Sequence, residues 1–119
     1  MSGVVDGQPV MVTGAGGSIG GAIARRLRAD GHRVVTIGHR PGADHVSDFT
    51  DDSLGRIVGS LGPIRAMALS HGYLEPGPAR DVVPATFRRM IEVNLISMYS
   101  IIHAALDQFA PGASIVLVS

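Results

Sequence analysis

Residues 10–20 read Val10-Met11-Val12-Thr13-Gly14-Ala15-Gly16-Gly17-Ser18-Ile19-Gly20. An apolar, β-branched run breaks there into four glycines within seven residues and then opens a helical pattern, which predicts a strand, a tight turn and a helix start. Glycine lets the backbone adopt positive φ and approach a phosphate closely, while the free amides of a helix N-terminus supply hydrogen-bond donors. This arrangement is typical of a turn that holds the pyrophosphate of a dinucleotide.

We therefore expect the segment from the end of this strand to the start of the helix to bind the pyrophosphate. Its candidate contacts are Thr13, Gly14, Gly16, Gly17, Ser18, Ile19 and Gly20. An ordinary strand-to-helix turn in a glycine-rich chain is the alternative, because glycine motifs alone give false positives.

The rest of the chain alternates strand and helix patterns. Helical spacing follows the glycines as far as Gly31 and returns over 51–61 and 84–109, whereas strands are expected at 34–37, 45–47, 64–69 and 114–119. Alternating strands and helices with right-handed crossovers predict an α/β fold with a Rossmann-like, doubly wound parallel sheet. At 119 residues we expect a single dinucleotide-binding domain over 1–119, truncated after the fifth strand.

Composition excludes several classes of function. Ten Arg balance ten acidic residues without basic clusters interleaved with aromatics, so no nucleic-acid partner is expected. No apolar stretch is long enough to span a membrane, and the N-terminus with Asp6 does not resemble a secretion signal. The absence of cysteine fits a cytoplasmic protein. The loosely spaced His39, Asp44, His45 and Asp48 are expected to be solvated, with no metal bound.

Four segments, taken in order, resemble the short-chain dehydrogenase/reductase family. They are the glycine segment, the loop 70–78, the helix segment Met90-Ile91-Glu92-Val93-Asn94-Leu95 and the strand 114–119, so the resemblance covers essentially the whole chain. It implies an oxidoreductase that passes hydride between a nicotinamide cofactor and a small alcohol or carbonyl substrate. It also implies a catalytic role for Asn94, which would organise a proton relay through a bound water. A structural hydrogen bond to a neighbouring strand is the alternative, and the position of Asn94 on an apolar stripe predicts burial.

The chain departs from the family pattern in three places. Ser18 stands where the compact members have their middle glycine, so the spacing Thr-Gly-x-x-Gly-x-x-Gly is closer to the extended branch. The motif Asn-Asn-Ala-Gly becomes Leu69-Ser70-His71-Gly72, and we expect Ser70, His71 and Gly72 to line the cofactor cleft. The catalytic Tyr-x-x-x-Lys pair is missing, since Tyr99 is followed four places on by His103 and the chain contains no Lys.

The end of the second strand points to the choice of cofactor. Ile37-Gly38-His39-Arg40 offers no acidic residue for the ribose 2′-hydroxyl, whereas Arg40, with His39, would suit a 2′-phosphate. A preference for NADP(H) over NAD(H) is therefore expected, with a solvated loop arginine as the alternative. Asp48-Phe49 resembles the family's acidic contact to the adenine amino group, although Asp48 could equally cap the next helix or lie in solvent.

Three functions compete on these grounds. We favour the cofactor-binding part of an NADP(H)-dependent short-chain dehydrogenase/reductase, expected to be inactive by itself. A non-catalytic nucleotide-binding or interaction module, a pseudoenzyme, is the main alternative. A methyltransferase-like Rossmann protein is disfavoured because no acidic residue ends either of the first two strands. An uncovered edge strand at 115–118 with apolar faces predicts self-association into a homo-oligomer.

Overall fold

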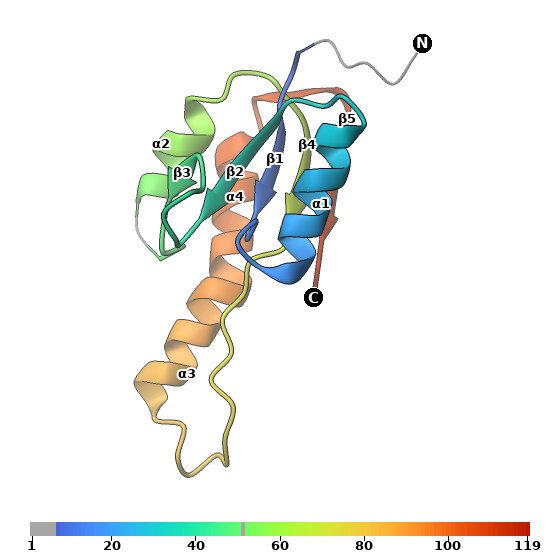
Figure 1. Cartoon of the computed structure of the whole chain (residues 1–119). Helices are drawn as coiled ribbons and strands as arrows, with labels where there is room; N and C mark the ends of the chain where they lie inside the picture. The colour runs from blue at the N-terminus through green and yellow to red at the C-terminus, as the bar shows by residue number, and fades with distance from the viewer. Residues whose placement is uncertain (1–6, 51) are drawn as a thin grey trace.

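The computed structural model describes residues 7–50 and 52–119, which form one parallel sheet with helices on both faces (Figure 1). The strands are β1 (Val10–Thr13), β2 (Val34–Gly38), β3 (His45–Val46), β4 (Ile64–Leu69) and β5 (Phe109–Leu117). The helices are α1 (Ser18–Ala29), α2 (Ser53–Gly59), α3 (Pro84–Ile91), the π helix η1 (Glu92–Ile96) and α4 (Ser97–Ala105). None of the described helices is long and apolar enough to cross a lipid bilayer.

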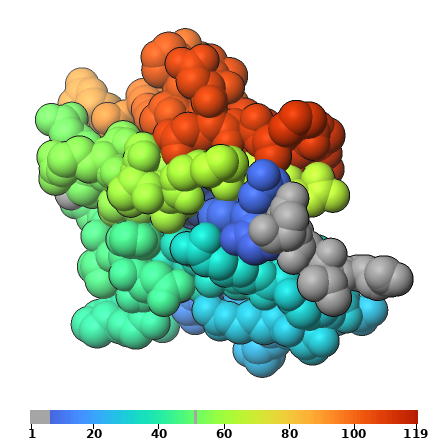
Figure 2. All heavy atoms as spheres, turned by 90° about the horizontal axis from the view of Figure 1, so that it is seen from above, coloured from blue at the N-terminus to red at the C-terminus, as the bar shows by residue number. Residues whose placement is uncertain are grey.

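The sheet has the order β3-β2-β1-β4-β5, and every neighbouring pair is parallel. The chain thus adds β2 and β3 on one side of β1 and then β4 and β5 on the other. In Figure 2 the blue N-terminal part of the chain accordingly lies between a teal segment and a yellow-green one. Thr13 is in register with Ile37 and Leu69, so β1, β2 and β4 end at one level. Ligands of open α/β sheets bind where the strand order reverses, here between β1 and β4. The doubly wound, Rossmann-like prediction is confirmed.

Helices cover the sheet unequally. α1 packs on one face through Ala24, against Val10, Val12 and Ala68. α2 and α4 cover the opposite face and bury a larger apolar cluster. Its buried members are Met11, Ile37, Phe49, Leu54, Val58, Ile64, Met67, Leu69, Val93, Ile101 and Ala105. All four residues of β1 are buried, as expected for a central strand covered on both sides.

The long helix expected over 84–109 is interrupted and ends early. A π turn, η1, separates α3 from α4, and α4 ends at Ala105, so that Phe109 begins β5. β5 thus runs over Phe109–Leu117, where the sequence predicted a strand over 114–119. The third strand ends at Val46 and not at residue 47, and Asp51, where a helix was expected to start, lies outside the described residues.

Gln108 gives the physical reason why the helix stops. Its side-chain amide donates to the backbone carbonyls of Val58 and Gly62, each at 2.9 Å. The backbone carbonyl of Gln108 accepts from the Ile64 amide at 2.7 Å. These bonds tie the chain to the start of β4 and are incompatible with another helical turn. Pro111, which has no backbone donor, is tolerated because β5 lies at the edge of the sheet.

β5 leaves one edge of the described sheet uncovered. Ile115, Val116 and Leu117 are 41%, 54% and 56% exposed, although they are apolar and lie in a strand. The expected edge strand is confirmed, whereas the association state stays a prediction.

We expect the 119-residue chain to self-associate through β5, because an apolar edge strand pairs readily with another chain. Val116→Lys places a charge on this edge and should shift the population towards monomer in sedimentation velocity over a concentration series. Val46→Lys, which replaces a valine of similar exposure on the opposite edge strand, is the matched control and should leave association unchanged. A monomer at every concentration in the unsubstituted chain would refute the expectation.

Candidate nucleotide-binding site

The turn between β1 and α1 packs directly against the loop that follows β4. Gly14 has a φ of +72°, and a Cβ there would lie 2.8 Å from the backbone nitrogen and Cα of His71. A Cβ at Gly20 would lie 2.2 Å from the Gly14 carbonyl oxygen and 2.7 Å from Ser70 Oγ. Neither position has room for a side chain, so packing within the protein already explains both glycines.

Gly16 and Gly17 need a different explanation. Both are exposed, and a Cβ at Gly16 would meet nothing closer than Arg40 Cδ, at 3.9 Å. No side chain caps the N-terminus of α1, where Gly17 is the N-cap residue and Ser18 and Ile19 are exposed, so the first amides of the helix face outward. The fold itself therefore does not require glycine at position 16, and its absence of a side chain leaves the backbone there open to close approach.

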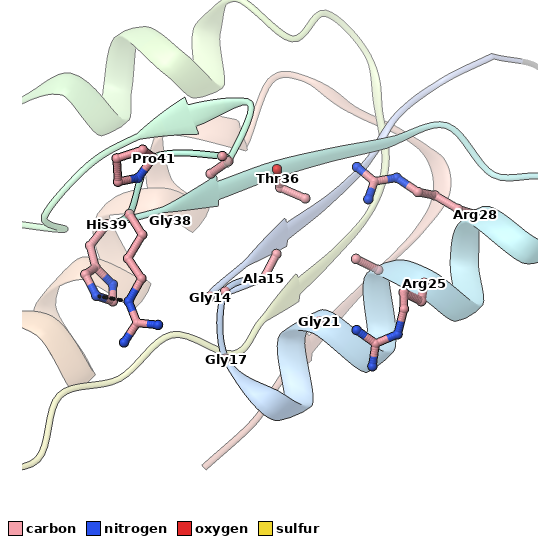
Figure 3. A pocket seen from close by; sticks show the side chains of 15 residues that line it. Gly14, Ala15, Gly17, Gly21, Arg25, Arg28, Thr36, Gly38, His39 and Pro41 are labelled. Carbon is pink, nitrogen blue, oxygen red and sulfur yellow. Dashed lines mark hydrogen bonds between the residues drawn. The ribbon is translucent and has the colours of Figure 1, made fainter.

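A cleft of about 290 Å³ opens between this turn, α1 and the segment 38–43 (Figure 3). Arg25 and Arg28 lie on its α1 side and His39 lies across from them, at the end of β2. Arg40 also lines the cleft, and its Nε–H donates to His39 Nε2 at 3.3 Å. Among the described residues that line this cleft, none is acidic. Its walls therefore carry positive charge.

Asp44 is close to this cleft but is engaged in its own contacts. One carboxylate oxygen accepts hydrogen bonds from the backbone amide and the hydroxyl of Thr36, at 2.9 and 3.2 Å. The same oxygen lies 4.0 Å from a guanidinium nitrogen of Arg28. Asp44 thus holds the segment after β2 against the middle of that strand, short of the strand end where an acidic residue would meet a ribose.

A second cleft of about 370 Å³ lies at the ends of β1 and β4. Its lining residues are Gly14, Gly17, His39, Asp48, Phe49, Ser70, His71, Gly72, Tyr73, Arg89 and Val93. Gly14, Gly17 and His39 line both clefts, so the two adjoin across the glycine turn. Together they form one elongated site at the position where the strand order reverses.

His71 forms a buried connection at the base of the second cleft. Its Nδ1 lies 2.7 Å from Thr13 Oγ1, its Nε2 lies 2.6 Å from Ser97 Oγ, and its side chain is buried. The ring stacks on Phe49, with centroids 3.9 Å apart and planes inclined by 8°. Burial disfavours the charged form and lowers the pKa of His71 from 6.5 to about 4, so the ring is neutral near pH 7.

Phe49 and Asp48 lie beside this histidine, after β3. Phe49 is buried and has a φ of +66°, a left-handed conformation that costs a non-glycine residue about 1–3 kcal/mol and that clusters at functional sites. The Asp48 carboxylate accepts from the amide and the hydroxyl of Thr50, at 2.9 and 2.8 Å. The N-cap residue of α2 is Asp52, so Asp48 does not cap that helix and instead lines the cleft.

Asn94 is exposed, so the prediction that it is buried was wrong. It lies in the π turn, whose extra residue per turn shifts the helical faces that a regular 3.6-residue period predicts. Its amide nitrogen donates to the Tyr73 carbonyl at 2.7 Å, and its amide oxygen accepts from the Tyr73 backbone at 2.8 Å. Asn94 thus clamps the loop after β4, and the partner is this loop and not a strand.

The structure brings most of the predicted residues together. Those that line one or both clefts are Gly14, Gly16, Gly17, His39, Arg40, Asp48, Phe49, Ser70, His71 and Gly72. Those that do not are Thr13 and Gly20, which are buried, and Ser18, Ile19 and Asn94, which are exposed. Among residues 7–50 and 52–119, no group of three or more potential metal ligands comes together.

Sequence reasoning missed several residues of the site. Arg25 and Arg28 line the first cleft because they lie on α1 one and two turns beyond the glycines, a spacing that could have been used. Tyr73 and Arg89 meet in the second cleft, with the guanidinium 5.1 Å from the ring centroid. Nothing in the sequence pairs these two residues, or His71 with Ser97.

Comparison with known proteins gives the same picture. The model of the NAD dependent epimerase/dehydratase family matches residues 10–118. The L-xylulose reductase of Homo sapiens is 32% identical over 102 residues, covering 75% of this chain and 42% of that protein. The aldohexose dehydrogenase of Thermoplasma acidophilum superposes with a TM-score of 0.83 at 26% identity, over 94% of this chain and 49% of that one. A short-chain dehydrogenase/reductase of Brucella melitensis gives a TM-score of 0.85 at 24% identity, over 93% and 56%.

The chain spans about half the length of these relatives. What it shares with the two solved structures is the fold over nearly its whole length. The chain therefore belongs to the NAD dependent epimerase/dehydratase family, and its fold is that of the cofactor-binding part of the short-chain dehydrogenases/reductases, which are NAD(P)-dependent oxidoreductases.

Proposed function

We propose that this chain binds a nicotinamide dinucleotide along the two adjoining clefts and supplies the cofactor-binding part of an oxidoreductase acting on a small alcohol or carbonyl compound. One observation carries the proposal: the surrounding structure leaves room for a side chain at position 16, yet the residue there is glycine, in the turn beside the reversal of the strand order. A pyrophosphate that accepts hydrogen bonds from the amides after Gly14 would require this absence of a side chain.

A preference for NADP(H) is part of the proposal. Arg40 and His39 follow β2, where a ribose 2′-substituent would lie, and Arg25 and Arg28 add positive charge to the same cleft. No acidic side chain lines that cleft among the described residues, and the nearby Asp44 carboxylate is engaged with Thr36 and Arg28. Asp48 and Phe49 in the second cleft, with Ser70, His71 and Gly72, are the proposed adenosine contacts.

The roles of the chain's own residues are binding and orientation. The bound cofactor would supply the hydride chemistry. We propose that Asn94 supports the reaction from the π turn, while the sequence lacks the Tyr-x-x-x-Lys pair that would move the hydroxyl proton. The 119 residues are therefore proposed to bind cofactor without turnover. A cytoplasmic location and a homo-oligomeric state complete the proposal.

The second candidate is a non-catalytic nucleotide-binding module. The observation on which it rests concerns the described residues alone: Tyr99 is 70% exposed and stacks on His103, which stands four places on, where a Tyr-x-x-x-Lys pair would have its lysine. Both candidates predict nucleotide binding. They differ in whether hydride transfer occurs in the longer protein or assembly that contains this chain.

Gly16→Val tests the central observation. The apo fold has room for this side chain, whereas a pyrophosphate lying on the turn does not, so we expect an unchanged melting temperature. Affinity for NADPH should fall roughly 5- to 150-fold, as steric overpacking of about 1–3 kcal/mol implies. Gly55→Val in α2, where a Cβ also meets nothing within 4 Å, is the matched control and should bind normally. Equal affinity of the two variants by calorimetry would refute the proposed site.

Arg40→Ala tests the cofactor preference. Loss of a charge-assisted contact worth about 1.5–3 kcal/mol should weaken NADPH binding roughly 10- to 100-fold and leave NADH binding almost unchanged. Arg26→Ala removes another exposed arginine, which lies on α1, pairs with Asp30 and does not line the cleft, and it should alter neither affinity. Parallel losses for both coenzymes in Arg40→Ala would contradict NADP(H) selectivity.

A further inference from the structure

The hydrogen bonds around His71 have a direction that the geometry fixes. Ser97 Oγ donates its single proton to the Val93 carbonyl at 2.6 Å, so towards His71 it can act only as an acceptor. Nε2 of His71 must therefore carry the ring proton. Nδ1 of the neutral ring is then an acceptor for the Thr13 hydroxyl, which itself accepts from the Ser70 amide at 3.0 Å.

This chain of hydrogen bonds ends in the π turn. The Ser97 amide bonds to the Glu92 carbonyl, one residue further back than in an α-helix, and so does not serve Val93. The Ser97 hydroxyl donates to Val93 instead, and it is held in place by His71. One residue beyond Val93 in the same turn, Asn94 grips the loop after β4.

We propose that His71 is a positioning residue which, as a neutral ring protonated on Nε2, holds the π turn and Asn94 against the end of β1. It replaces the small residue of the family pattern with a connector of three elements: β1 through Thr13, the segment after β3 through the Phe49 ring, and η1–α4 through Ser97. The same connector fixes Tyr73 and Val93, which line the second cleft. Its effect on nucleotide affinity rests on the proposed function, whereas the hydrogen-bond direction does not.

The neutral form sets the direction of the bond to Thr13. A second ring proton on Nδ1 would reverse it, because Thr13 Oγ1 would then accept from the ring and its own proton would need another acceptor. The titratable and charged groups that share the cleft are His39 after β2, Asp48 beside the stacked Phe49 and Arg89 on α3, while Glu92 lies on η1. Burial lowers the pKa of His71 to about 4, against the smaller opposing effect of a hydrogen bond to the Val93 backbone.

Long-range proton–nitrogen NMR spectra of the full chain without ligand test the assignment directly. At pH 7 the ring of His71 should be neutral and carry its proton on Nε2. A proton on Nδ1, or a charged ring at that pH, overturns the proposal.

Two substitutions separate hydrogen bonding from space filling. His71→Gln keeps one acceptor and one donor on a neutral planar group, whereas His71→Phe keeps a flat ring that can stack on Phe49 but makes neither hydrogen bond. We expect the Asn94 side-chain amide and Tyr73 backbone resonances to stay near their original positions in His71→Gln and to move in His71→Phe. Unmoved resonances in His71→Phe would show that the ring only fills space.

Ser97 provides a second test if His71→Phe does not fold. Ser97→Ala removes the link between the ring and the Val93 carbonyl, and Ser97→Thr retains the hydroxyl. The Asn94 amide resonances should shift in the alanine variant and be restored in the threonine variant. Identical spectra for the two variants overturn the proposal.

The pH dependence of stability gives an independent readout. The unfolded chain takes up a proton on His71 near pH 6.5, whereas the folded chain does so at about 4, so stability is full above 6.5 and is lost as pH falls towards 4. In urea unfolding, the free energy of unfolding should fall less between pH 6.5 and 4 in His71→Gln than in the unsubstituted chain. The difference should correspond to the single proton that the unfolded chain takes up on His71. Equal pH slopes for the two proteins overturn the assignment. If the unsubstituted chain binds no nucleotide while these results hold, the proposed function fails and the role of His71 stands.

Discussion

The structure depends on the contact between two backbones, the turn after β1 and the loop after β4. At Gly14 these two segments approach so closely that a Cβ would lie 2.8 Å from the backbone of His71, and Gly20 is confined in the same way. The Thr13 and Ser70 hydroxyls bond across this contact, with Ser70 Oγ donating to the Thr13 carbonyl at 2.5 Å. This packing brings the glycine turn to the reversal of the strand order, and both clefts form around it.

Sequence patterns predicted the sheet, because apolar runs and turn residues depend on neighbours along the chain. They also located the glycine turn, Arg40 and the Ser70-His71-Gly72 segment, which all line the site. They failed where distant contacts decide: Gln108 ends the helix before Phe109 through bonds to the chain preceding β4, and the π turn exposes Asn94. The role of His71 could not be predicted, since Thr13 and Ser97 lie 58 and 26 residues away in sequence.

The site offers both backbone and side-chain contacts to a ligand. Amides at the start of α1 face outward without a capping side chain, while arginines of α1 and of the segment after β2 make the adjoining cleft positive. The second cleft is built differently, from a strained Phe49, a buried neutral histidine and an arginine stacked over Tyr73. A ligand with a charged middle and a flat aromatic end matches this division, as a dinucleotide does.

A proton–nitrogen correlation spectrum of the labelled chain, recorded during titration with NADP⁺, would locate a bound nucleotide on the fold. We expect saturable shifts concentrated on the amides of residues 14–20, on 38–40 and on 70–73, with resonances of α2 and of β5 largely unmoved. A folded chain whose spectrum does not change at millimolar NADP⁺ or NAD⁺, or whose shifts fall outside these segments, would contradict this expectation.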